Sequence, residues 1–291
     1  MPTPLEMEGQ IEVIQGSLGS GKSAVSMCEA VEHLLFGGVV ATNFNFTPDW
    51  AWLLSGRGLF ARLGLSDRFE VAEGLRKRCF KIGCIDSIME ISGREGKKMR
   101  ELCQGRMSKK REAYGLLVID EAHMFFNARA YNKNKEYIDF FSQARKNGWR
   151  VILVAHSIEM LDKQIRFFVE LESRFRNLRK VKAPFLPFSL SPVPAFLIVR
   201  KYAGKGPGAG QKHSIDLRFL HKDTASMYSS FEIFAFDDVA RRSSLQGLPV
   251  DQIPAAREYY KKRHGVYPGK TRPVYKGNIR GPYSVYCPKP I

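Results

Sequence analysis

The sequence predicts an α/β fold in which a mostly parallel sheet is flanked by helices, followed by a small β-rich extension and a basic C-terminal tail. Three observations predict it. The apolar run Ile11–Gln15 leads into a glycine-rich loop and then a helix-forming segment. The apolar runs 116–119 and 150–155 have the length and composition of buried parallel strands. Polar segments with helical periodicity alternate with these strands.

The loop after the first strand matches the phosphate-binding P-loop pattern G-x-x-x-x-G-K-[ST], with the residues Gly16, Ser17, Leu18, Gly19, Ser20, Gly21, Lys22 and Ser23. Its glycines allow successive backbone N–H groups to face a phosphate chain. Lys22 is expected to reach the β- and γ-phosphates of ATP, and the Ser23 hydroxyl to bind Mg²⁺. The helix predicted over 22–36 directs its positive end at the same phosphates. The alternative is a glycine-rich turn without a ligand.

A second strand ends in two adjacent acids, Asp120 and Glu121, after the run 116–119. Asp120 is suited to hold Mg²⁺ together with Ser23. Glu121 is suited to orient and deprotonate an attacking water. Such an acid beside the magnesium ligand favours a Mg-dependent ATP hydrolase over a kinase-like transferase. The alternative is a strand end with two solvated acids.

The composition is globular and strongly basic, with 44% hydrophobic residues and a net charge of +17 over 291 residues. That charge predicts a polyanionic partner, either nucleic acid or an anionic membrane surface. Five cysteines without metal-ligand spacing fit a reducing compartment. We expect no signal peptide in residues 1–10 and no transmembrane helix, because the prolines of the uncharged run 183–199 would break one. We read that run as a connector, with membrane contact as the alternative.

The chain divides into three predicted parts: a P-loop ATPase core over 1–181 with an insertion at 47–112, a β-rich extension over 182–236, and a tail over 237–291. Strands are expected at 39–43, 174–181, 195–202 and 213–220, and helices at 135–146 and 223–230. The stretch 93–112 contains eight Lys/Arg residues and is expected to be a loop, either solvated or facing DNA.

The tail is basic and rich in tyrosine. Between residues 241 and 291 it has 11 Lys/Arg against 2 Asp/Glu, with tyrosines interleaved. One interpretation is a flexible, solubilising tail. The other is a nucleic-acid arm in which arginines contact phosphates and tyrosines stack on bases.

Taken in order, these features resemble the zonula occludens toxin (Zot) family and its filamentous-phage assembly ATPases, within the DNA-pumping and virus-packaging P-loop ATPases. The resemblance covers roughly residues 10–236. It rests on the P-loop, the strand ending at Asn43, the run Asp120-Glu121-Ala122-His123, Arg145 before Gly148, and the region from Ile165 to Arg176.

The resemblance implies roles for two further residues. Arg145 precedes the last core strand, where related ring ATPases often place an arginine that reaches the ATP of a neighbouring subunit. Arg174 and Arg176 are rival candidates, and the alternative for Arg145 is a surface arginine at a helix C-terminus. His156 lies where the family senses the γ-phosphate, usually with Thr-Gln in place of Ala155-His156, so a structural histidine is its alternative.

The implied function is an ATPase, fuelled by ATP with Mg²⁺, that handles phage or viral DNA without reading its sequence during virion assembly or export. A homo-oligomeric ring in the host cytoplasm is expected, with membrane-bound assembly proteins as further partners and attachment to the inner membrane left open. The alternatives are a DNA-packaging or transfer motor of a non-filamentous virus or mobile element, and an assembly scaffold with little turnover. The family's toxin activity is expected to belong to a portion without counterpart here.

Overall fold

A computed structural model describes residues 10–44, 46–47, 50–57, 67–82, 85–105, 107–109, 112–126, 131–178, 195–203, 209–220, 224, 227 and 244–245. Most of the tail, residues 179–194 and most of 221–243 therefore lie outside the described part. The helix expected at 223–230 lies there too, apart from residues 224 and 227.

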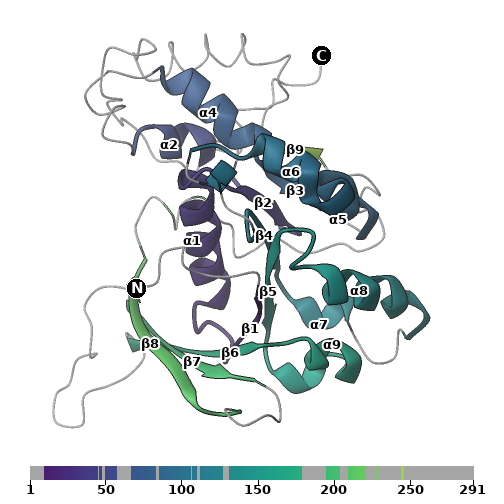
Figure 1. The fold of residues 1–291 in the computed structure, drawn as a ribbon. Helices are drawn as coiled ribbons and strands as arrows, with labels where there is room; N and C mark the ends of the chain where they lie inside the picture. The colour runs from purple at the N-terminus through teal and green to yellow at the C-terminus, as the bar shows by residue number, and fades with distance from the viewer. Residues whose placement is uncertain are drawn as a thin grey trace, which may run out of the picture.

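One nine-stranded sheet organises the described chain, in the order β8-β7-β6-β1-β5-β4-β2-β3-β9 (Figure 1). Strands β6, β1, β5, β4, β2 and β3 run parallel, and β7, β8 and β9 are antiparallel to their neighbours. This confirms the predicted mostly parallel sheet. The strands are β1 Ile11–Gln15, β2 Val39–Thr42, β3 Cys79–Lys81, β4 Gly115–Ile119, β5 Trp149–Ala155, β6 Leu171–Asn177, β7 Ala195–Tyr202, β8 Lys212–Phe219 and β9 Ser244–Leu245.

Helices cover both faces of the parallel strands, and β1, β4 and β5 are fully buried between them. On one face α1 (Lys22–Leu35), α2 (Trp50–Ser55) and α4 (Arg68–Lys77) pack on a core that includes Trp50 and Phe44. On the other lie α5 (Ile85–Ser92), α6 (Lys97–Leu102), α7 (Ala122–Phe125), α8 (Tyr131–Gln143) and α9 (Lys163–Phe167), around Trp149 and Phe126. Figure 1 shows α1 on the left of the sheet and α7, α8 and α9 on the right.

Several local predictions need correction. The stretch 93–112 is not a loop throughout: it holds α6 and two short 3-10 turns, with Met99 and Met107 buried in the core. The segment 47–112 contains β3, a strand of the sheet where no strand is predicted, and its being an insertion stays a prediction. The strand expected at 174–181 begins at Leu171, and the helix expected at 135–146 is α8.

The β-rich extension joins the same sheet. Strands β7 and β8 pair antiparallel beside β6, so they extend the core sheet at one edge. The domain boundary at residue 181 stays a prediction. Among the tail residues that the structure describes, Ser244 and Leu245 pair with β3 at the other edge of the sheet.

A buried ion network joins the first strand and helix to the edge strands. Glu12 of β1 contacts Arg150 of β5 at 2.9 Å and Arg200 of β7 at 3.1 Å. Glu29 of α1 contacts Arg150 at 3.2 Å and Arg218 of β8 at 2.8 Å. Burial alone raises the pKa of Glu12, but Arg200 and Arg150 lower it to about 2, so the carboxylate is charged. These pairs fix α1 against the sheet.

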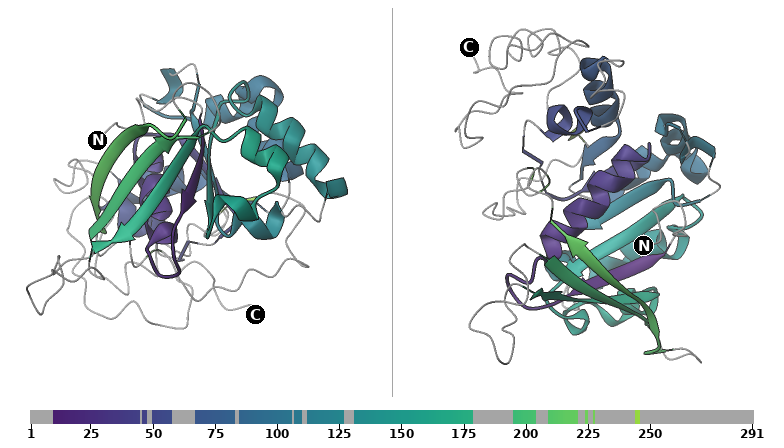
Figure 2. Two further views of the ribbon diagram at one scale, coloured as in Figure 1. Left: turned by 90° about the horizontal axis from the view of Figure 1, so that it is seen from below. Right: turned by 90° about the vertical axis from the view of Figure 1, so that its left-hand side faces the viewer.

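The opposite face of the edge strands exposes apolar side chains. Ile215, Leu217 and Phe219 alternate along β8 and are 57%, 43% and 60% exposed. Viewed from below, β6, β7 and β8 have α1 behind them and no described helix in front (Figure 2, left). Among the described residues, no helix is long and apolar enough to span a membrane.

Candidate functional site

The glycine-rich loop follows β1 and leads directly into α1, as the motif requires. Gly21 has a φ of 92° and forms the N-cap of α1 without a side-chain hydrogen bond. A Cβ at this position would lie 2.1 Å from the Phe196 ring of β7, so space and backbone conformation both require glycine. The first-turn N–H groups of α1 therefore point into the loop without a side-chain cap.

Lys22 closes this loop from inside. Its Nζ donates hydrogen bonds to the Gly16 carbonyl at 2.8 Å and the Ser17 carbonyl at 3.2 Å. Burial lowers the pKa of Lys22, while the nearby Glu121 and Asp120 carboxylates act in the opposite direction. Ser20 Oγ is buried and makes no hydrogen bond within the described residues. An uncapped helix N-terminus, an orphan hydroxyl and a lysine at one loop fit a phosphate ligand.

The acid pair lies at the same edge of the sheet. Strand order β1-β5-β4 brings the carboxyl ends of these strands together, and Gln15 pairs in register with Ala155, next to His156. Asp120 is buried, and its backbone exchanges two 2.8 Å hydrogen bonds with the Asn43 amide of the loop after β2. The sheet thus gathers the P-loop, Asp120, Glu121 and His156 at one edge.

Glu121 has an uncommon backbone conformation. Its φ of 49° and ψ of 44° place it in the left-handed region at the N-cap of α7. Its N–H donates to Asp120 Oδ1 at 3.0 Å, and its carbonyl accepts from the Met124 N–H at 2.8 Å. Left-handed geometry at a non-glycine residue costs free energy, and it is frequent at functional sites.

Two histidines surround the Glu121 carboxylate. His156 Nε2 lies 3.7 Å from Glu121 Oε2, and His123 Nδ1 lies 3.3 Å from the same oxygen. No role is predicted for His123 from its place in the sequence. The signal in the sequence is that His123 follows Glu121 by two residues, at the start of the helix that begins after the acid pair. Both residues therefore lie on the first turn of α7.

The candidate arginines lie in different places. Arg145 is exposed at the turn between α8 and β5 and pairs with Glu112. It lies at the amino ends of the parallel strands, whereas the P-loop and the acid pair lie at their carboxyl ends. The structure does not bring it near its own P-loop. Arg174 pairs in register with Gln15, the residue before the loop, and contacts Glu172 at 3.1 Å. Arg176 lies two residues further along β6 and is also exposed.

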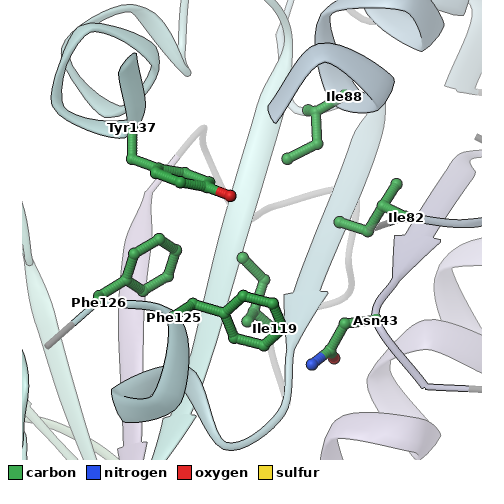
Figure 3. Close-up of a pocket in the computed structure, with 7 residues that line it drawn as sticks. All are labelled: Asn43, Ile82, Ile88, Ile119, Phe125, Phe126 and Tyr137. Atoms are coloured by element: carbon green, nitrogen blue, oxygen red, sulfur yellow. The ribbon is translucent and has the colours of Figure 1, made fainter. Parts of the chain in front are cut away.

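A separate apolar cleft lies beside the acid pair (Figure 3). It is lined by Asn43, Ile82, Ile88, Ile119, Phe125, Phe126 and Tyr137. No residue of the P-loop lines it, and the Asn43 amide already binds the backbone of Asp120. We therefore assign the phosphate site to the P-loop edge and not to this cleft.

Comparison with known proteins gives matches to phage proteins. The Gene 1 protein of Enterobacteria phage I2-2 is 28% identical over 180 residues, which cover 60% of this chain and 42% of that protein. The Gene 1 protein of Enterobacteria phage M13 is 28% identical over 176 residues, covering 60% and 44%. The chain thus spans less than half the length of these relatives.

A solved structure with a related outline is the N-terminal domain of zonular occludens toxin from Neisseria meningitidis, at 15% identity and a TM-score of 0.43, covering 77% of this chain and all of that domain. The family model described as Zonular occludens toxin (Zot) matches residues 10–187, more than half of the chain. With its P-loop and acid pair on one parallel sheet, the chain belongs to the Zot family.

Proposed function

We propose that the chain is a Mg²⁺-dependent ATP hydrolase that couples turnover to the handling of phage or viral DNA during virion assembly or export. One observation carries the proposal: the P-loop with Lys22 follows β1, the acids Asp120 and Glu121 follow β4, and the strand order β1-β5-β4 brings these carboxyl ends to the same end of the sheet. A lysine for phosphates beside an acid for Mg²⁺ and an acid for water is the set that phosphoanhydride hydrolysis needs.

Each residue then has a task. The backbone amides of residues 16–23 and the Lys22 ammonium hold the phosphates. Ser23 and Asp120 hold Mg²⁺, which neutralises phosphate charge when bound. Glu121 accepts a proton from the attacking water, and His156, beside this acid at the same edge, senses the phosphate. A positive charge from Arg145, or from its rivals Arg174 and Arg176, completes the set from a neighbouring copy.

The proposed partners are DNA and further copies of the chain. The net charge of +17 supports binding to a polyanion. The exposed apolar residues of β8 support a protein contact, since such a stripe on an edge strand favours association. A ring is proposed because an arginine supplied from outside needs a neighbour. We place the protein in the host cytoplasm, with membrane-bound assembly proteins as further partners, because the matched Gene 1 proteins are phage proteins.

The test is steady-state ATP turnover by the purified chain, with and without single- and double-stranded DNA. Glu121→Gln is the control, because it keeps the size of the side chain and removes the base. Turnover that DNA stimulates and that Glu121→Gln reduces to a small residual rate supports the proposal. ATP binding with negligible turnover, with or without DNA, would favour a nucleotide-gated scaffold instead.

A further inference from the structure

The Glu121 carboxylate is approached by two imidazoles from separate elements. His123 belongs to α7, directly after β4, and His156 follows β5. Both reach the same oxygen, Oε2, at 3.3 Å and 3.7 Å, and the two rings lie 5.6 Å apart with an interplanar angle of 47°. Two residues that follow different strands thus converge on one carboxylate oxygen.

The contact atoms are shielded from solvent and have unused hydrogen-bonding capacity. Glu121 Oε2 and His123 Nδ1 are both buried, and neither makes a hydrogen bond in the part of the chain that the structure describes. An ionised carboxylate accepts hydrogen bonds only, so the favourable state of this contact has the proton on His123 Nδ1. A buried donor or acceptor without a partner costs free energy, so a hydrogen bond between these two atoms would be favourable for both.

The backbone at this point is fixed while the carboxylate is not. The Asp120 backbone is bonded to Asn43, and the Glu121 N–H is bonded to the Asp120 carboxylate. These bonds set where the Glu121 Cα lies, but they leave the direction of its side chain open. Within the described residues, the groups that contact its carboxylate in an ion pair are the two histidines.

We propose that His123 is a positioning residue: a small rotation of its ring turns Nδ1–H toward Glu121 Oε2, 3.3 Å away, and the resulting hydrogen bond holds the carboxylate in the direction needed to receive the proton of the attacking water. His156 supports the same oxygen from the end of β5. This inference rests on the proposed function, because it takes Glu121 as the base. A misdirected base costs rate without costing nucleotide affinity.

The kinetic test compares two substitutions of His123. His123→Leu keeps bulk and removes the nitrogen, whereas His123→Asn keeps an amide N–H near the place of Nδ1. We expect His123→Leu to lower kcat for ATP about 10- to 100-fold with nucleotide Kd unchanged, and His123→Asn to retain most of kcat. Met124→Ala, exposed on the same turn, is the matched control and is expected to behave as the unaltered chain.

A double-mutant cycle connects the effect to the acid. In the Glu121→Gln background, His123→Leu is expected to cause no further decrease in kcat, since a residue acting through the base has nothing left to position. An equal fold-decrease in both backgrounds overturns the inference. So does a His123→Asn variant as slow as His123→Leu.

A second readout does not depend on turnover. In chain labelled with ¹⁵N-histidine, the His123 signal is identified by its disappearance in His123→Asn. At a pH where the ring is neutral, it is expected to report the Nδ1–H form and to lose that preference in Glu121→Ala. A chain that hydrolyses no ATP would refute the proposed function, and the tautomer would still decide the inference. An Nε2–H form in the unaltered chain overturns it.

Discussion

Lys22 bonds to its own loop. Its ammonium donates to the Gly16 and Ser17 carbonyls, so it holds the loop closed. A phosphate entering the loop would take over these bonds, and each charged hydrogen bond contributes about 1.5–3 kcal/mol. Lys22 can thus bond either to the two loop carbonyls or to phosphates, and its positive charge would favour the phosphates.

The first prediction concerns this charge. Lys22→Ala is expected to weaken nucleotide binding about 10- to 100-fold and to abolish hydrolysis, without changing salt-sensitive DNA binding. Titration with a fluorescent ATP analogue and a turnover assay measure the two effects. Lys163→Ala, an exposed lysine of α9, is the control and should match the unaltered chain. Turnover retained in Lys22→Ala would contradict the site assignment.

At the scale of elements, the ion network determines how α1 sits against the sheet. Glu12 and Glu29 are fully enclosed, and their counter-charges come from β5, β7 and β8. Because α1 carries the P-loop at its N-terminus, the antiparallel edge strands help to fix the loop. Phe196 of β7 does so directly, since its ring fills the space beside Gly21.

The second prediction concerns this network. Glu12→Gln removes one of the two buried carboxylates that Arg150 and Arg200 share and leaves them with Glu29. We expect a loss of about 3 kcal/mol of unfolding free energy at pH 7, the lower end of the cost of breaking a buried pair. The exposed pair of Glu73 with Lys77 provides the control: Glu73→Gln should cost less than about 1 kcal/mol. Urea unfolding of both variants measures the difference.

Glu12 also makes the free energy of unfolding depend on pH. The folded pKa of Glu12, about 2, lies below its ordinary value of 4.5, so its stabilisation is present above pH 4.5 and disappears as pH falls toward 2. The shift corresponds to about 3 kcal/mol. Unfolding free energy of the unaltered chain should therefore fall more steeply between pH 5 and 3 than that of Glu12→Gln. If the two curves of unfolding free energy against pH were parallel, Glu12 would not be the residue that causes the loss of stability in acid.

Strands next to the P-loop are predictable because their apolar runs are long and end in chemically distinctive residues. Strand β3 cannot be predicted in this way, because it has only three residues and follows the charged Arg78. Arg78 is nevertheless buried, since it donates to the Leu34 and Gly38 carbonyls at the end of α1. The start of β6 is hard to place because Glu172, Arg174 and Arg176 alternate on an open face and read as a polar segment. At the site, the contact of His123 with Glu121 cannot be predicted from the sequence, because the fold brings His123 and His156 to the same carboxylate oxygen.

For the whole molecule, the proposed function requires a surface on which positive charge would bind DNA. The exposed residues Lys97 and Lys98 lie at the start of α6, and the exposed Arg94 lies in the 3-10 turn just before it. Two residues of the basic tail, Ser244 and Leu245, pair with β3 at the same end of the molecule (Figure 1). Parts of two basic segments far apart in the sequence therefore lie at one end, which favours this end as the DNA-binding surface.

The last prediction follows from that placement. Binding of the chain to DNA of random sequence should weaken linearly on a plot of log affinity against log salt. Replacing Arg94, Lys97 and Lys98 by Gln should reduce the slope by about 0.9 for each phosphate that these cations neutralise, or about 0.7 on a single strand. The matched control replaces Lys163, Lys201 and Lys212, which lie on α9, β7 and β8, and should leave the slope nearly unchanged. Equal slope changes in both triple variants would mean that the charge acts as a diffuse field over the whole surface, with no localised binding of DNA at α6.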